Sequence, residues 1–443
     1  MTAHDPQIDR QQSRALGIDF GTSNSVVAQA SGHAVDLWNF AAPDGDTSVF
    51  RSALCFWEDP DVRGGLGHEA GPWAIAEFLD FPAGSRFLQS FKSVAASPSF
   101  DSASLFTKRL KFEELGEIFL SHLLRHGGAR PSALPERIVV GRPVHYVGAR
   151  PDPALARARY DAMFALLGRP VHYVYEPLGA AYGFAMRQSQ PATLLVADFG
   201  GGTSDFSIVR IEAPDAERRC TPLGSAGIGI AGDRFDYRIL DHLVLPVLGK
   251  GGTYENFGKV LEISANYYAD FRDWSKLALM RNRKTLDELH RLHRAATDPA
   301  AIARMIAVVE HELGHGLYEA VGRLKRALSS EDKADFVFES DDLSIEKPVT
   351  RADFEEWIAP DLTRISATLD AALADARLEA GDIDLVFLTG GSSLIPAVRA
   401  IFADRFGNDR LATGEELTSI AHGLAQIGLA DDMEQWIAPE ATE

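Results

Sequence analysis

The sequence predicts an α/β protein with a duplicated core, because one strand–turn–strand pattern occurs twice. Residues 194–210 read LLVADFGGGTSDFSIVR, an apolar run that ends in an acid, turns at three glycines and alternates again. Residues 16–28, LGIDFGTSNSVVA, keep the same order. Short aliphatic runs bounded by glycine are typical of buried strands. Two such hairpins, far apart in the chain, indicate two halves that face each other across a cleft.

The glycine tips of the hairpins indicate a phosphate-binding role. Gly200, Gly201 and Gly202 can adopt positive φ and allow a ligand to approach the backbone. The N–H groups of a tight turn form a concavity for phosphate oxygens, and a nearby carboxylate suits a hydrated divalent cation. Asp19 and Asp198 stand at the corresponding strand ends. The sequence contains no GxxxxGK[ST] motif, and neither hairpin is a GxGxxG turn that opens a helix.

Composition limits the partners and the compartment. A length of 443 residues predicts more than one core, and a formal net charge of -19 argues against nucleic acid or an anionic membrane as a partner. The two cysteines, Cys55 and Cys220, have no paired spacing, which fits a reducing cytosol. The N-terminal stretch MTAHDPQIDRQQSR is polar and no apolar run approaches the length of a membrane span, so we expect no signal peptide and a cytoplasmic location.

Both hairpins resemble the two phosphate loops of the actin, hexokinase and heat-shock ATPase superfamily. The pair of motifs GIDFGTSNSVVA and DFGGGTSDFSI is most similar to the ATPase domain of the heat shock protein 70 (DnaK-type) chaperones. The resemblance implies an actin-like ATPase fold, in which two lobes with duplicated ribonuclease-H-like α/β cores and two smaller inserted subdomains surround a nucleotide cleft. It also implies ATP or ADP with Mg²⁺ as cofactors, and Asp19 and Asp198 as the residues that hold the hydrated cation.

The resemblance also sets expected domain boundaries. Lobe I would span residues 14–190, with an inserted subdomain at about 36–115, and lobe II would span 191–430, with an inserted helical subdomain at about 236–305. Residues 1–13 and 431–443 would be flexible termini. The chaperones continue into a linker and a β-rich peptide-binding domain, whereas this sequence stops at 443, so we expect no peptide-binding domain.

The first half of the chain contains residues that match family positions. Lys92, in SRFLQSFKSVAAS, is the best match to a lysine that points at the γ-phosphate, with Lys108 and Lys111 as alternatives; a lone lysine is otherwise usually a surface residue. Residues 105–126 form an amphipathic helical pattern. Pro143, after the strand RIVVGR, matches a proline that relays nucleotide state, although a strand-ending proline needs no function.

Glu176 opens a predicted helix and matches the acid that lies near the catalytic water. A carboxylate at a helix N-terminus is also stabilised by the helix dipole, and both roles are compatible. We therefore expect Lys92, Glu176, Asp198 and Asp205 to be the catalytic group, in which Lys92, Glu176 and Asp205 position water.

Nucleotide contacts are implied at matching positions along the whole chain. They are Gly21, Thr22, Ser23 and Asn24; Gly200, Gly201, Gly202 and Thr203; Gly232, Lys325, Arg326 and Ser329; and Gly390, Gly391 and Ser392. Two positions depart from the family pattern. Gly322 replaces a glutamate that contacts ribose, a role that Glu319 could take, and Leu394 replaces an arginine that stacks on adenine.

A literal HExxH, His311-Glu312-Leu313-Gly314-His315, offers a different interpretation. Two histidines at i and i+4 on a helix could bind zinc while the glutamate acts as base. The third ligand of a metalloprotease is missing, since Tyr318 stands where the metzincin motif has glycine. We therefore disfavour a zinc protease. The preceding segment, 241–298, reads as mostly helical.

The resulting hypothesis is a chaperone-related ATPase that hydrolyses ATP slowly without a partner, since phosphoryl transfer to water needs positioning and charge neutralisation. Its output would be lobe closure, read by an unidentified protein or co-chaperone. The alternatives are a sugar-type kinase of the same superfamily and an actin-like filament or scaffold protein.

Overall fold

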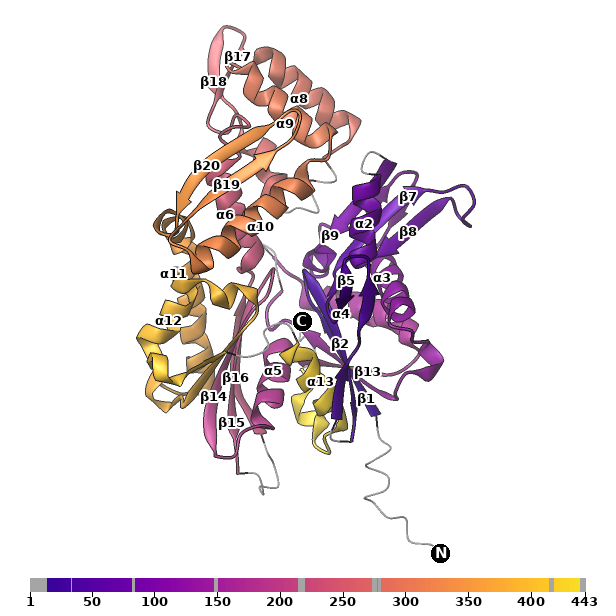
Figure 1. Ribbon diagram of the computed structural model, residues 1–443, viewed down its shortest axis with the longest axis vertical. Coiled ribbons are helices and arrows are strands. Elements are labelled where there is room, and N and C mark those ends of the chain that lie inside the picture. The colour runs from indigo at the N-terminus through magenta and orange to yellow at the C-terminus, as the bar shows by residue number, and fades with distance from the viewer. Residues whose placement is uncertain are drawn as a thin grey trace, which may run out of the picture.

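A computed structural model describes residues 14–32, 34–81, 84–146, 150–213, 220–272, 277, 280–413 and 418–438. It contains two large sheets whose strands follow the same order (Figure 1). The first sheet has the order β13-β12-β1-β2-β3, with β6 paired to β2, and the second has β22-β21-β14-β15-β16. In the first sheet, β1, β2 and β3 pair antiparallel in that order, and β12 and β13 add parallel strands on the other side of β1. In the second sheet, β14, β15 and β16 pair antiparallel, and β21 and β22 add parallel strands on the other side of β14. The predicted duplication of the strand pattern is therefore present in the topology.

The hairpins are the strands that the sequence pattern predicts. Asp198 pairs with Asp205 across the second hairpin, and Asp19 pairs with Val26 across the first. The strands of the first sheet are β1 (Arg14–Phe20), β2 (Asn24–Ser31), β3 (Ala34–Leu37), β6 (Phe50–Arg51), β12 (Arg137–Arg142) and β13 (Val171–Tyr175). Those of the second are β14 (Ala192–Phe199), β15 (Ser204–Ile211), β16 (Cys220–Ile228), β21 (Leu385–Thr389) and β22 (Leu411–Thr413).

Two helices rich in small residues lie between the sheets. These are α5 (Glu176–Ala185) and α13 (Ser419–Leu429), which contact each other and share a buried apolar cluster with both sheets (Figure 1). A Cβ atom on Gly17 of β1 would lie 2.4 Å from the Ala421 carbonyl oxygen of α13. Glycine is required there because helix and strand backbones touch.

Four further helices cover the opposite face of each sheet and complete the two main cores. On the first sheet these are α3 (Phe112–His126) and α4 (Pro153–Phe164), and on the second α11 (Arg351–Ala376) and α12 (Pro396–Phe406). Apolar side chains from one sheet face and from the facing helix stripes fill the space between them, as expected for layered α/β packing.

Smaller elements extend from each half. Beside the first sheet lie a three-stranded sheet and one helix: β7 (Ala53–Glu58), β8 (Leu66–Ala70), β9 (Ser85–Gln89) and α2 (Pro72–Asp80), with the short hairpins β4 (Phe40–Ala42)–β5 (Gly45–Thr47) and β10 (Ala103–Leu105)–β11 (Lys108–Leu110). The second half adds α6 (Gly232–Leu243), β17 (Thr253–Asn256), β18 (Lys259–Glu262), α8 (Arg283–Ala295), α9 (Pro299–Glu310), α10 (Gly314–Ser330), β19 (Lys333–Glu339) and β20 (Ser344–Thr350).

Three predictions about local structure need correction. The predicted helix 105–126 begins at Phe112, because Phe106 has a φ of 54° and turns the chain into the β10–β11 hairpin. The segment 241–298, expected to be mostly helical, contains the β17–β18 hairpin before α8, so the expected helical insertion 236–305 is of mixed structure. Both errors arise because strands of three or four residues are too short to carry a clear apolar period.

The third correction concerns the C-terminal segment, which we expected to be flexible over 431–443. Residues 431–438 are packed instead: Trp436 is buried edge-on against Tyr182 of α5, with ring centroids 5.1 Å apart. The Ala438 N–H also donates to the Tyr173 carbonyl oxygen at 2.8 Å. Residues 1–13 and 439–443 lie outside the described residues.

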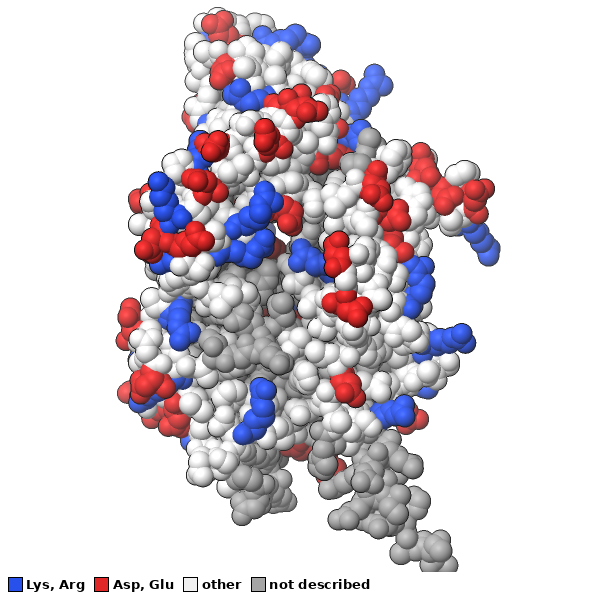
Figure 2. Space-filling view, in the orientation of Figure 1, with Lys and Arg blue, Asp and Glu red and all other residues white. Residues whose placement is uncertain are grey.

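Charged side chains of both signs are dispersed over the face shown in Figure 2, and Lys and Arg gather near its middle, between the two halves. The free cysteines Cys55 and Cys220 are buried in the cores. No helix among the described residues is long and apolar enough to cross a membrane.

Candidate functional site

The two glycine hairpins meet tip to tip between the halves of the molecule. A Cβ atom built on Gly201 would lie 2.5 Å from Ser23 Oγ and 3.2 Å from Asp233 Oδ1. The second tip is closed by a hydrogen bond from the Gly200 N–H to the Thr203 carbonyl oxygen at 3.0 Å. Segments from opposite halves of the sequence are therefore in contact at the point where both predicted phosphate loops turn.

A lysine and four acids are buried next to these tips. They are Asp19, Lys92, Glu176, Asp198 and Asp205. The Lys92 ammonium donates to Glu176 Oε1 at 2.5 Å, and Nζ lies 5.7 Å from the centroid of the Phe20 ring. The four predicted catalytic residues and the predicted metal ligand Asp19 are thus brought together.

Burial and neighbouring negative charge raise the pKa values of Asp19 and Asp198 in this group. Burial, the charge of Glu176 and only partial compensation by Lys92 raise the pKa of Asp19 to about 7. Burial and the charges of Glu176, Asp19 and Asp205 raise the pKa of Asp198 well above its usual value. Carboxyl groups held together in this way favour a shared proton or a bound cation.

Lys92 is the one of the three lysine candidates that lies in this group. It belongs to a short 3-10 segment, Phe91–Val94, that follows the C-terminal end of β9, and its side chain is buried. Lys108 is exposed on β11, and Lys111 is the exposed residue that precedes α3. The resemblance alone favoured Lys92, and burial distinguishes it from the other two.

Asp205 has a structural contact that its sequence position did not suggest. Its Oδ1 atom accepts hydrogen bonds from the backbone N–H groups of Val144 at 2.8 Å and His145 at 3.2 Å. These residues follow Pro143 at the end of β12. The acid on the second hairpin therefore fixes the turn after Pro143 in the first half of the chain.

The residues expected to contact adenosine converge on the N-terminus of α6. A Cβ atom on Gly232 would lie 3.0 Å from Ser392 Oγ and 3.5 Å from Lys325 Nζ. Gly390 has a φ of 80°, and a Cβ atom there would lie 2.1 Å from the Phe199 carbonyl oxygen, so glycine is required. Three separate segments thus reach the same place, next to the second hairpin.

Some of these side chains have partners within the protein. Lys325 forms an ion pair with Asp236 at 2.8 Å, and Ser329 Oγ donates to the Lys325 carbonyl oxygen one turn earlier in α10. Gly322 leaves the surface of α10 without a side chain at that position. The Arg326 side chain lies over it, since a Cβ atom built on Gly322 would be 3.4 Å from Arg326 Nη1. Leu394 is half exposed.

Arg51 is a residue of this region that the sequence analysis missed. Its Nη1 atom donates to Asn24 Oδ1 at 2.9 Å, at the edge of the first hairpin. Burial lowers its pKa, and the charges of Glu319 and Asp233, which lie on the other half, oppose that shift. No motif marks Arg51, because its role depends on the pairing of β6 with β2.

The HExxH segment does not form a zinc site. Helix α9 ends at Glu310 and α10 begins at Gly314, and Glu312 between them has a φ of 51°. His311 pairs with Asp342, and the His315 ring packs against Phe78 and Phe87. The i, i+4 geometry needs one continuous helix, which the break removes.

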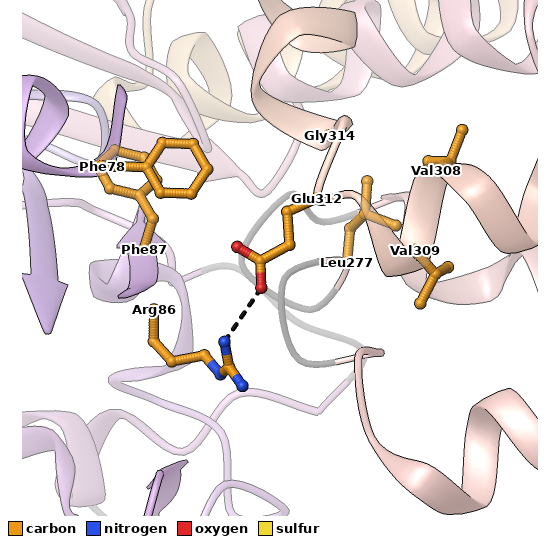
Figure 3. A pocket seen from close by; sticks show the side chains of 8 residues that line it. All are labelled: Phe78, Arg86, Phe87, Leu277, Val308, Val309, Glu312 and Gly314. Atoms are coloured by element: carbon orange, nitrogen blue, oxygen red, sulfur yellow. Dashed lines mark hydrogen bonds and ion pairs between the residues drawn. The ribbon is translucent and has the colours of Figure 1, made fainter. Parts of the chain in front are cut away.

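Glu312 instead joins the two halves. Its carboxylate accepts from Arg86 of β9 at 3.1 Å and from Arg281 at 2.9 Å. Figure 3 shows the pair of Arg86 and Glu312 at the edge of a pocket walled by apolar side chains from both halves.

These observations define the class of molecule: an α/β protein with a topologically duplicated core, in which two glycine hairpins and a buried acidic group share one centre. A family model described as "Hsp70 protein" matches residues 171–251 and 309–430. The matched segments include the second hairpin, α5, α10, α12 and α13. Over most of its length the chain is similar to proteins of the heat shock protein 70 family.

Individual relatives extend the match to the first half. Chaperone protein DnaK of Thermus thermophilus is 25% identical over 416 residues, which cover 90% of this chain and 57% of that protein. The DnaK of Deinococcus deserti is 30% identical over 437 residues, 94% of this chain and 60% of that protein. Heat shock 70 kDa protein BIP3 of Oryza sativa subsp. japonica is 28% identical over 318 residues, 71% of this chain and 39% of that protein. The chain spans less than two thirds of the length of these relatives, and the named chaperones do not favour the kinase or filament alternatives.

Proposed function

We propose that this chain is an Hsp70-type ATPase unit that binds ATP and Mg²⁺ between two actin-like lobes and hydrolyses ATP slowly. The observation that carries the proposal is the contact between the two hairpin tips at Gly201 and Ser23. Two turns that meet in this way can hold the phosphate chain of one nucleotide from opposite sides, because each contributes backbone N–H groups and small hydroxyl side chains.

The buried acids fit a divalent cation. Asp19 and Asp198 would hold it, since burial and neighbouring negative charge raise their pKa values and a bound cation would stabilise the charged carboxylates. When bound, Mg²⁺ neutralises charge on the phosphate oxygens. The pair of Lys92 and Glu176 beside these acids suits the orientation of a water molecule, while Asp205 keeps the turn after Pro143 against the same centre.

The adenosine end would lie where Gly232, Ser392 and Lys325 converge. Gly390 and Gly391 leave the backbone open beside the second hairpin. The half-exposed Leu394 offers an apolar surface to the base in place of the family's arginine. Arg326 and Glu319 lie on α10, the helix that also carries Lys325, and their charged side chains are the candidates for contacts with the ribose.

The domain arrangement follows from the same proposal. Lobe I would comprise 14–190 and lobe II 191–430, with α5 and α13 as the connecting helices on which the lobes close. Closure of the lobes on ATP would be the conformational change that a protein partner or co-chaperone recognises. A cytoplasmic location stays a prediction.

Calorimetry with ATP, ADP and GTP, each with and without Mg²⁺, tests this function. We expect wild type to prefer adenine nucleotides and to need Mg²⁺. Asp198→Asn should weaken Mg²⁺-dependent binding by about tenfold or more, since one carboxylate near the cation is lost. Asp404→Asn, an exposed acid on α12, is the matched control and should behave as wild type. Absence of nucleotide binding by wild type, or binding that is indifferent to Mg²⁺ and to Asp198, would contradict the proposal.

A further inference from the structure

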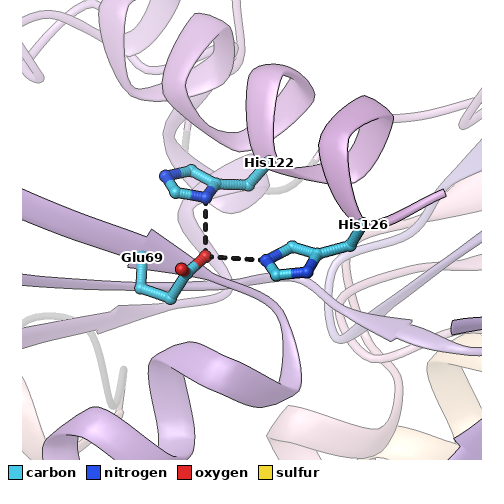
Figure 4. A group of neighbouring side chains, drawn as sticks. All are labelled: Glu69, His122 and His126. Carbon is cyan, nitrogen blue, oxygen red and sulfur yellow. Dashed lines mark hydrogen bonds and ion pairs between the residues drawn. The ribbon is translucent and has the colours of Figure 1, made fainter. Parts of the chain in front are cut away.

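A carboxylate and two imidazoles meet between β8 and the last turns of α3 (Figure 4). Glu69 belongs to β8, and His122 and His126 are one turn apart on α3. One ligand atom from each residue lies within 4.8 Å of the other two. These residues are shared neither with the candidate nucleotide site nor with the segments that the family model matches.

The guanidinium of Arg125 already occupies the point on which the three side chains converge. Its Nη2 atom lies 2.5 Å from Glu69 Oε2, 2.7 Å from His122 Nδ1 and 3.2 Å from His126 Nε2. This nitrogen carries two hydrogens, so it can satisfy two of the three acceptors with good geometry. A metal ion has no hydrogens to distribute and accepts lone pairs from all three.

The surrounding contacts hold the two rings in position. His122 is buried, and its Nε2 atom lies 2.8 Å from His68 Nδ1, so the other ring nitrogen faces Glu69. His126 stacks on Trp73 with ring centroids 3.5 Å apart and an interplanar angle of 11°. Outer contacts of this kind orient histidine ligands in metal sites.

The Glu69 carboxylate is held in place by contacts with both rings and with the backbone. Its Oε1 atom lies 2.6 Å from His122 Nδ1 and 3.0 Å from His126 Nε2, and it accepts a hydrogen bond from the Ala70 N–H at 2.9 Å. Arg125, in contrast, is 58% exposed, so its side chain can move into solvent without leaving a buried charge.

We propose that Glu69, His122 and His126 bind a zinc ion or a similar divalent transition metal, which displaces the Arg125 guanidinium. Two imidazoles with one carboxylate suit zinc, whereas Mg²⁺ and Ca²⁺ prefer oxygen ligands only. Metal bonds of about 2.0–2.2 Å separate neighbouring ligand atoms by about 3.3 Å in a tetrahedral site. The 2.6 Å between His122 Nδ1 and Glu69 Oε1 therefore has to widen, by a small rotation of the Glu69 side chain. Water would complete the coordination, and the ion would tie β8 to α3.

Titration of the metal-free full chain with Co²⁺ and with Zn²⁺ tests the proposal. We expect one equivalent of Co²⁺ to give visible absorption bands, Zn²⁺ to abolish them by displacement, and Zn²⁺ to raise the melting temperature. His126→Gln and Glu69→Gln should each weaken Zn²⁺ binding by about 100-fold or more, since losing a ligand costs more than losing an outer-shell partner. His311→Gln, in the broken HExxH segment, should bind Zn²⁺ as wild type does.

The decisive variant is Arg125→Ala, which removes an exposed side chain and should fold normally. Zn²⁺ should bind about tenfold more tightly, because the competing cation and its repulsion are gone. Arg109→Ala, an exposed arginine on β11, is the matched control. The proposal is overturned if wild type shows no saturable one-to-one binding, if Arg125→Ala does not bind more tightly, or if His126→Gln binds as wild type does.

Discussion

Lys92 and Glu176 form a buried ion pair at the centre of the candidate nucleotide site. Their side chains are 6% and 7% exposed, and their N–O distance is 2.5 Å. Burial by itself lowers the pKa of Lys92, but the charge of Glu176 and its hydrogen bond more than offset this, so the lysine remains charged. A buried pair of this kind is costly to break on one side only, because the remaining charge has no partner.

We predict that Lys92→Met lowers the free energy of unfolding by about 3–5 kcal/mol and abolishes ATP hydrolysis. The double variant Lys92→Met/Glu176→Gln should regain most of the stability but none of the hydrolysis. Urea denaturation and a phosphate-release assay measure the two effects. Lys108→Met, at an exposed position on β11, should change neither. If Lys92→Met hydrolysed ATP at the wild-type rate, Lys92 would have no role in hydrolysis.

Asp205 acts across the two halves through its hydrogen bonds to the turn after Pro143. We predict that Asp205→Ala lowers the free energy of unfolding by about 2–4 kcal/mol, since two backbone N–H groups lose their acceptor. Asp205→Asn keeps one carbonyl oxygen and should lose less than half as much. Chemical denaturation of both variants makes the comparison, and equal losses would show that these two bonds are not what Asp205 contributes.

At the scale of elements, the crossing of α5 and α13 depends on glycine. A Cβ atom on Gly423 would lie 1.7 Å from the Gly179 carbonyl oxygen, a backbone atom that no rotamer change can move. The two helices pack at this short distance because both present small residues at the contact, and they form the layer between the sheets.

We therefore predict that Gly423→Ala destabilises the protein by about 1–3 kcal/mol, as overpacking of a close contact does. Gly381→Ala is the control, because a Cβ atom there meets nothing within 4 Å. Thermal and urea unfolding measure the difference, and equal stability of the two variants would mean that the helices can separate at little cost.

At the scale of the whole molecule, the two halves are linked at two levels. The helices α5 and α13 connect them low in the view of Figure 1, while Glu312 connects β9, which lies higher in that view, to Arg281 of the second half (Figure 3). If the nucleotide binds between the halves, the upper contact lies on the side that must open for release.

We predict that Glu312→Gln accelerates ADP release about fivefold, the effect of roughly 1 kcal/mol of lost interaction between partly exposed charges. Stopped-flow dissociation of a fluorescent ADP analogue measures the rate. Glu310→Gln removes an acid at the end of α9 that pairs with His290 of its own half, and it should release ADP at the wild-type rate. An unchanged rate for Glu312→Gln would exclude this contact as a restraint on opening.

Residues close together in the chain were sufficient to predict the two hairpins, the acid at the end of each leading strand and the start of α5 at Glu176. These features depend on local patterns, because strand alternation and glycine at a turn act within a few residues. The same local reasoning misplaced the start of α3 and favoured a continuous helix at His311–His315, where the structure has a break at Glu312 between α9 and α10.

Only the tertiary structure decided which distant residues meet. The contact of Gly201 with Ser23, the capping of the turn after Pro143 by Asp205 and the convergence of Glu69 with His122 and His126 each join segments that are remote from each other in the sequence. Such contacts follow from strand order and helix packing. A one-dimensional pattern does not contain them, because the free energy that forms them comes from burying whole faces of sheets and helices against one another.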